Sequence, residues 1–145
     1  MLPDELTDPD RDVPAREHAV RAEEDLLTAR HAVRADAVAA GFSIVDQTKI
    51  VTAASELVRN AYIHGGGGTM TVTAVRDAHG RVGLALSVRD EGPGIEDVEQ
   101  AMADGFSTGA GLGHGLGGTR RLMDEFTIDT APGEGTTVTV VRWKP

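Results

Sequence analysis

Glycine is concentrated in one part of this chain, and that concentration constrains the fold more than any other feature. Half of the 18 glycines in the 145 residues lie within positions 92–118, and four more form the run Gly65–Gly68. A linker between domains is a poor explanation, because a chain of this length makes one ordinary domain. Clustered glycines are more typical of backbone that approaches a ligand closely or that moves. The sequence predicts a single domain over residues 15–145 with a ligand-binding loop inside it.

Residues 1–14 differ from the rest in carrying acids and prolines with almost no apolar content. We expect a flexible acidic tail there, and its composition is opposite to that of a secretory signal peptide. No stretch approaches the roughly 18 consecutive apolar residues that a membrane span needs. The absence of cysteine favours a reducing, cytoplasmic location.

The net charge narrows the choice of partners. Fourteen Lys and Arg against 23 Asp and Glu leave a formal charge of −9. Nucleic acids and anionic membranes both select basic surfaces. The composition therefore argues against a nucleic acid or a membrane as the partner.

Apolar periodicity predicts an alternation of helices and strands. In chain order it indicates a short strand at 16–22, helices at 24–40 and 46–64, strands at 70–74 and 82–88, short helices at 95–103 and 118–126, and strands at 126–130 and 136–143. The second helix has a capping-box spacing at Ser43 and Asp46, and Asp46 could itself cap it. Strands that follow one another as hairpins favour a mixed, mainly antiparallel sheet with helices over one face.

Glu56 and Asn60 lie four residues apart, on one face of the second predicted helix and at the edge of its apolar arc. A solvated polar edge explains such a pair when it stands alone. The chemical alternative is that the Asn60 amide oxygen binds Mg²⁺ while the Glu56 carboxylate accepts a proton from a hydroxyl nucleophile.

Asp90 ends a predicted strand and begins the segment Asp90-Glu-Gly92-Pro-Gly94. The composition fits a simple turn, yet Asp90 keeps the parity of the apolar residues 82–88 and should face the core side. A carboxylate placed there needs a donor. The amino group of adenine is such a donor, whereas guanine presents an acceptor carbonyl at that position. Gly92 and Gly94 would let the backbone lie against the flat base.

Residues 104–117 form a glycine-rich loop that leads directly into a predicted helix carrying Arg120 and Arg121. A merely floppy loop is one interpretation. Regularly spaced glycines followed by a helix start favour the other, a phosphate site built from backbone N–H groups. The loop is neither a P-loop nor a dinucleotide-binding fingerprint, because it lacks the G-x-x-x-x-G-K-[ST] pattern and the parallel βαβ order.

Four boxes occur in an order that resembles the GHKL ATPase superfamily, which includes DNA gyrase, Hsp90, histidine kinases and MutL. The boxes are Glu56-Leu-Val-Arg-Asn60, Asp90-x-Gly92-x-Gly94, Gly111-Leu-Gly113-His-Gly115 and Gly135-Thr136-Thr137. Residues 42–60, 90–108 and 111–126 resemble in particular the RsbT-type serine/threonine protein kinases of the anti-sigma regulatory group. The similarity extends over about residues 24–143. His114 at a variable loop position, and Gly117-Gly118 where some relatives have proline, are its departures.

The resemblance implies a fold and a site. The fold would be a two-layer α/β sandwich of the Bergerat type. Glu56 would be the catalytic base and Asn60 the Mg²⁺ ligand that bridges the phosphates of ATP. Asp90 would recognise adenine with help from neighbouring groups, and backbone amides would hold the phosphates. The residues implied for nucleotide binding are Asn60, Asp90, Gly92, Gly94, Gly111, Gly113, Gly115 and Thr136.

The resemblance also implies a function. The chain would be an ATP-dependent serine/threonine kinase that phosphorylates a STAS-domain antagonist in a stressosome-like stress-response pathway. Once released, it would activate a PP2C-type phosphatase that controls a sigma factor.

Two alternatives stay open. The chain could be an anti-sigma factor that sequesters a sigma factor and phosphorylates its anti-anti-sigma factor. It could also be a nucleotide-gated binding module with negligible catalysis, although a pure binder has no need of Glu56 as a base.

Overall fold

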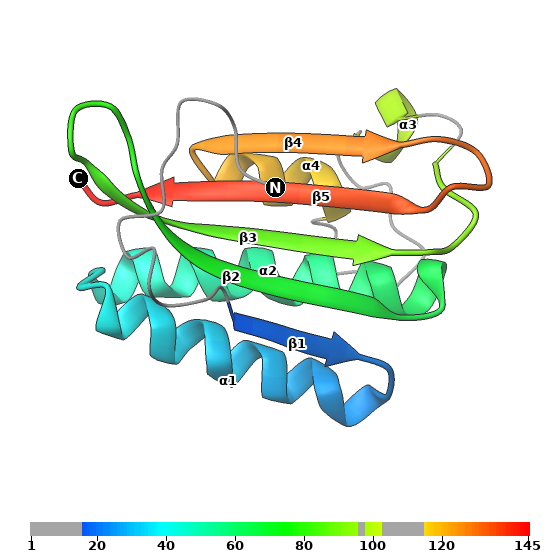
Figure 1. Ribbon diagram of the computed structural model, residues 1–145, viewed down its shortest axis with the longest axis horizontal. Coiled ribbons are helices and arrows are strands. Elements are labelled where there is room, and N and C mark those ends of the chain that lie inside the picture. Colours follow the sequence, from blue (N-terminus) through cyan, green and yellow to red (C-terminus); the bar gives the residue numbers. More distant parts are fainter. Residues whose placement is uncertain (1–15, 96–97, 103–114) are drawn as a thin grey trace.

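A computed structural model describes residues 16–95, 98–102 and 115–145, and its framework is a five-stranded sheet (Figure 1). The strands lie in the order β1-β2-β3-β5-β4, and each neighbouring pair is antiparallel. Their bounds are β1 Arg16–Val20, β2 Gly68–Arg76, β3 Val82–Asp90, β4 Glu125–Thr130 and β5 Thr136–Trp143. The sheet that sequence patterning predicted is therefore antiparallel throughout its described pairs.

The helices lie on one face of this sheet, as Figure 1 shows. Their bounds are α1 Glu23–Ala39, α2 Ile44–Gly65, α3 Val98–Met102 and α4 Gly115–Leu122. α2 contacts α1 and α4 and also packs on β3. The two-layer α/β sandwich and the order of elements are confirmed.

The last helix differs from its prediction at both ends. It begins at Gly115 rather than Gly118 and ends at Leu122 rather than Phe126. Its end comes early because Glu125 and Phe126 already pair with β5 as part of β4. Ladder pairing with a distant strand overrides the apolar spacing that suggested a longer helix.

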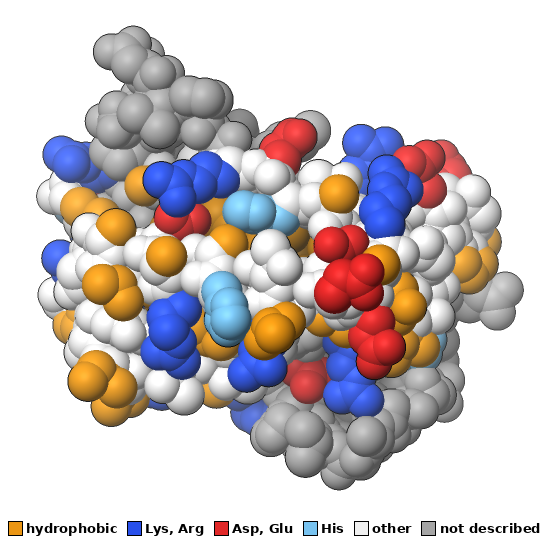
Figure 2. All heavy atoms as spheres, turned by 90° about the horizontal axis from the view of Figure 1, so that it is seen from below, with side chains coloured by type: hydrophobic (Ala, Val, Ile, Leu, Met, Phe, Trp, Pro, Cys, Tyr) orange, Lys and Arg blue, Asp and Glu red, His pale blue; other side chains and the backbone are white. Residues whose placement is uncertain are grey.

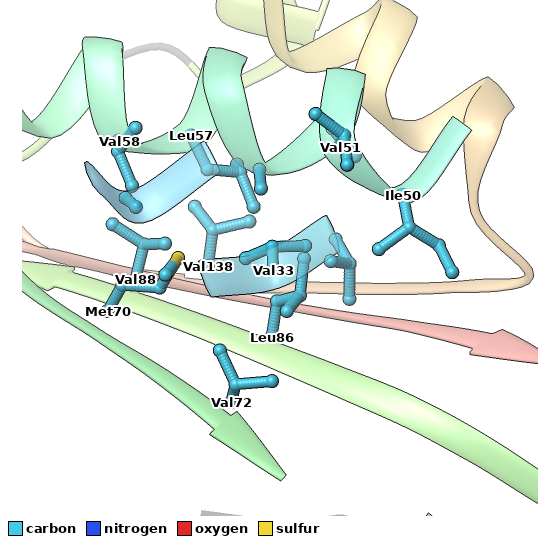
Figure 3. Packing of buried hydrophobic residues seen from close by; sticks show 14 of the residues in the cluster. Val33, Ile50, Val51, Leu57, Val58, Met70, Val72, Leu86, Val88 and Val138 are labelled. Carbon is cyan, nitrogen blue, oxygen red and sulfur yellow. The ribbon is translucent and has the colours of Figure 1, made fainter. Parts of the chain in front are cut away.

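The core lies between α2 and the sheet (Figure 3). Leu84, Leu86 and Val88 of β3 are buried on the helix side, and Leu57 and Val58 of α2 meet that layer. Full burial of an aliphatic side chain contributes about 1.5–3 kcal/mol. Because this core fixes α2 along β3, the position of each polar residue on the helix relative to the strand end is also fixed.

The ends of α2 explain its placement. Ser43 is the N-cap, and its Oγ accepts a hydrogen bond from the Asp46 amide at 3.2 Å. The prediction that Asp46 might itself cap the helix is wrong, because its carboxylate instead binds Arg142 of β5. Gly66 ends the helix with a φ of 73°, in the left-handed region where a glycine is favoured.

Charges of both signs share the surface. Figure 2 shows acidic and basic side chains interspersed over one face of the described chain rather than a continuous basic area. This distribution agrees with the net charge of −9 and does not favour nucleic acid binding. Within the described residues, no helix combines the length and the apolar character that crossing a bilayer requires.

Candidate functional site

Asp90 lies where three elements meet. In the sheet it pairs with Thr136 of β5 on one side and with Gly68 of β2 on the other. The side chain is half-buried, and its Oδ1 accepts a hydrogen bond from the Gly92 amide at 2.9 Å. The carboxyl group also lies against Gly65, at the end of α2. Asp90 therefore reaches the helix side of the sheet, as its parity along β3 predicted.

Gly65 and Gly92 keep room for this carboxylate. A Cβ atom at Gly65 would lie 2.4 Å from Cγ of Asp90, and one at Gly92 would lie 2.6 Å from Cα of Gly65. Contacts that short do not occur, so any side chain at either position would displace the acid. Sequence reasoning assigned Gly65 only to the end of a helix. The signal that could have identified its second role is the glycine run that begins inside the helix.

Gly94 and Thr136 approach the site from the far side of Asp90. Gly94 has a φ of 79°, and a Cβ there would lie 2.2 Å from the Ala131 carbonyl oxygen. Thr136 is buried, and its Oγ1 lies 2.9 Å from Oγ1 of Thr130. The structure thus brings Gly92, Gly94 and Thr136 close to Asp90. Thr130, which sequence reasoning missed, joins them.

Glu56 and Asn60 lie on α2, on the helix that ends against Asp90. Both side chains are half-buried, and neither forms a hydrogen bond or ion pair with another described residue. At 1.5 Å per residue, Asn60 stands about 7.5 Å and Glu56 about 13.5 Å before Gly65 along the helix axis. The two polar groups and Asp90 are therefore set out in sequence along α2.

The predicted phosphate loop is described only at its end. Gly111 and Gly113, with most of the loop 104–117, lie outside the described residues. Gly115 is the first residue of α4, so the loop leads directly into a helix, as predicted. Arg120 and Arg121 are exposed in the second half of this helix. α4 in turn packs against α2, which carries Glu56 and Asn60.

The residues present fit one kind of metal site. The described chain has no group of three or more His, Asp or Glu side chains that could form a protein-only metal site. A magnesium ion commonly takes one or two protein oxygens and completes its coordination with water and substrate phosphates. The amide oxygen of Asn60, without a protein partner among the described residues, is a suitable ligand of that kind.

Comparisons with known proteins agree with this arrangement. The family described as histidine kinase-, DNA gyrase B-, and HSP90-like ATPase matches residues 45–145. That span includes α2, Asp90, α4 and the β4–β5 hairpin.

Relatives extend the match over most of the chain. The chain is 45% identical over 124 residues to the serine/threonine-protein kinase RsbT of Bacillus subtilis, which covers 86% of this chain and 92% of the relative. It is 34% identical over 120 residues to an anti-sigma F factor of a Thermoanaerobacter species, covering 79% of this chain and 82% of the relative.

A solved structure supports the fold. The RsbU and RsbW domains of Rv1364c from Mycobacterium tuberculosis superpose with a TM-score of 0.62 at 24% identity. The match covers 92% of this chain and 34% of that one. It speaks for the architecture of the domain alone.

Proposed function

We propose that this chain, which belongs to the histidine kinase-, DNA gyrase B-, and HSP90-like ATPase family, uses ATP to phosphorylate a serine or threonine of a partner protein. The observation that carries the proposal is the alignment of Glu56 and Asn60 on α2 with Asp90 at the end of the same helix. A binding module needs the acid at the base site. A kinase needs all three groups in line.

Asp90 recognises the base in this proposal. Its carboxylate only accepts hydrogen bonds when ionised, so it favours the amino group of adenine over the carbonyl group of guanine. Gly92 and Gly94 keep side chains away from the face of the base, and Thr136 adds a hydroxyl beside the acid. Backbone amides at Gly111, Gly113 and Gly115 hold the phosphates.

Glu56 and Asn60 act on the phosphates. When bound through Asn60, Mg²⁺ neutralises charge on the phosphate oxygens. Glu56 accepts the proton of the serine or threonine hydroxyl as the hydroxyl oxygen bonds to the γ-phosphorus and the bond to the ADP oxygen breaks. Phosphoryl transfer depends on positioning and charge neutralisation more than on covalent chemistry, so this small set of side chains suffices.

The partner follows from the resemblance to RsbT-type kinases. We assign the acceptor to a STAS-domain antagonist of a stressosome-like complex, and the downstream partner to a PP2C-type phosphatase in a sigma-factor pathway. We place the activity in one domain of residues 15–145, in the reducing cytoplasm that a chain without cysteine tolerates.

A second candidate function is that of an anti-sigma factor, which the similarity to anti-sigma F factors favours. Such a protein sequesters a sigma factor and phosphorylates its anti-anti-sigma factor. Both candidates use the same nucleotide site, so they differ in the partner that is bound.

Phosphate transfer tests the proposal. The chain is incubated with γ-labelled ATP, Mg²⁺ and the STAS-domain protein encoded by the same organism. The expected result is label on a serine or threonine of the STAS protein. Tight ATP binding without transfer to any STAS partner would favour a nucleotide-gated binding module. Capture of a sigma factor in the presence of ATP would favour the anti-sigma candidate.

A further inference from the structure

Thr130, the last residue of β4, lies in the centre of a hydrogen-bond network beside Asp90. Its Oγ1 lies 2.9 Å from the amide nitrogen of Ile95, 3.1 Å from the carbonyl oxygen of Gly135 and 2.9 Å from Oγ1 of Thr136. These partners belong to the segment after β3, the β4–β5 turn and the start of β5. One hydroxyl therefore joins the segments that surround the acid.

Counting protons assigns the direction of each bond. A hydroxyl has one proton to donate and two lone pairs that accept. The Ile95 N–H donates to Thr130, and the carbonyl of buried Gly135 can only accept, so the proton of Thr130 goes to Gly135. The remaining lone pair of Thr130 then accepts the hydroxyl proton of Thr136. Thr136 is left with lone pairs alone for any other neighbour.

The register of the sheet places this hydroxyl next to the acid. Asp90 and Thr136 are paired across β3 and β5. Directly paired residues of an antiparallel ladder point to the same face, with Cβ atoms about 4.5–5.5 Å apart. An ionised carboxylate and a hydroxyl whose proton is already engaged are both acceptors. The end wall of the site is therefore built to receive donors.

The backbone around Thr130 is held independently of its hydroxyl. The Gly133 amide donates to the Pro93 carbonyl at 2.7 Å, and the backbone of Gly94 lies against the Ala131 carbonyl. Loss of the hydroxyl would therefore release the proton of Thr136 while the β4–β5 turn and the segment after β3 stay joined.

We propose that Thr130 is a positioning residue for base specificity: it engages the proton of Thr136 and so keeps the wall beside Asp90 selective for a donor at position 6 of the purine. This inference rests on the proposed function, since it assumes that the base of a nucleotide meets Asp90. A 6-amino purine matches two acceptors. A 6-oxo purine meets them with a third acceptor and is rejected.

Calorimetric titration of the full chain with ATP and with inosine triphosphate, both with Mg²⁺, tests this role. The two nucleotides differ at position 6 of the base, where inosine carries a carbonyl. In Thr130→Val, the free hydroxyl of Thr136 can turn and donate to that carbonyl. The preference for ATP should fall by roughly tenfold, which is the effect of one hydrogen bond. Thr130→Ser keeps a hydroxyl and should retain the wild-type preference.

A matched control lies on the opposite face of the sheet. Thr139→Val removes a hydroxyl from the Ser87–Thr139 pair, whose oxygens lie 3.2 Å apart, and should leave the preference unchanged. Equal weakening of both nucleotides in Thr130→Val, or an unchanged ratio, would overturn the specificity role. So would a Thr130→Ser variant that behaves like the valine variant. Failure of the wild type to bind either nucleotide would instead contradict the proposed function itself.

Discussion

The carboxylate of Asp46 and the guanidinium of Arg142 meet at 2.8 Å, although 96 residues separate them in the chain. Asp46 belongs to the first turn of α2, and Arg142 to the end of β5. Arg142 also donates to the Leu122 carbonyl, at the end of α4, at 3.3 Å. One side chain thus ties the start of α2, the end of α4 and the sheet together, and both charged groups are largely removed from water.

Loss of this tie should destabilise the fold. Arg142→Met should lower the free energy of unfolding by about 2 kcal/mol, because it leaves a buried carboxylate without its charged donor. Urea unfolding followed by circular dichroism measures the change. Arg16→Met is the control: it breaks an ion pair with Asp36 in which the arginine side chain is 65% exposed, and it should cost less than about 1 kcal/mol. Equal losses in the two variants would contradict this interpretation of Arg142.

The same pair predicts a pH dependence. The hydrogen bond from Arg142 holds the pKa of the Asp46 carboxyl below its ordinary value. Since the folded pKa is depressed, the stability from this group is present above the unfolded pKa of about 3.9 and is lost as pH falls through the folded pKa. The wild type should exceed Asp46→Asn in stability by a constant amount between about pH 7 and pH 5. That difference should shrink below about pH 4 in unfolding curves measured across the range. Asp129→Asn, at an exposed carboxylate of β4, is the control and should show no such convergence.

Much of this fold follows from local pattern. Alternation in β3 predicted correctly that Asp90 faces the helices, and Ser43 caps α2 as its spacing to Asp46 indicated. Asp46 itself was assigned wrongly because its partner is Arg142, which no local pattern connects to it. Thr130 was missed for a similar reason. It is one threonine among several in a β-rich segment, and only strand register places it beside Thr136.

Gly65→Ala should impair nucleotide binding more than folding. Alanine suits a helix better than glycine, but its Cβ would lie 2.4 Å from Cγ of Asp90 and must push the acid away. ATP affinity should fall at least about tenfold, as calorimetry can show. Gly80→Ala is the control, since Gly80 lies in the β2–β3 turn with a φ of 81° and open space around it. It should lose some stability and keep ATP affinity, and a Gly65→Ala variant with unchanged affinity would separate Asp90 from the base.

Asp90→Asn tests the choice of nucleotide. The wild type should bind ATP with Mg²⁺ and bind GTP much more weakly, because the carboxylate accepts where guanine also accepts. The amide of the variant can donate at that position, so ATP binding should be lost or nearly lost and discrimination against GTP should weaken. Calorimetry of both nucleotides on both proteins gives the result. Equal affinities of the wild type for ATP and GTP would rule out the adenine assignment.

Glu56 and Asn60 separate a kinase from a binder. If Glu56 is the base, Glu56→Ala should leave ATP binding nearly intact while transfer to the STAS partner slows by about 10²–10⁴-fold. Asn60→Ala should weaken Mg²⁺-dependent ATP binding together with transfer, because it removes the one protein oxygen assigned to the metal. Both positions are half-buried at the edge of the α2 core, and alanine favours helices, so circular dichroism should show both variants folded. Labelled phosphate transfer measured beside nucleotide titration distinguishes the two losses. A folded Glu56→Ala variant that phosphorylates its partner at the wild-type rate would remove Glu56 from the chemistry and leave α2 with a purely binding role.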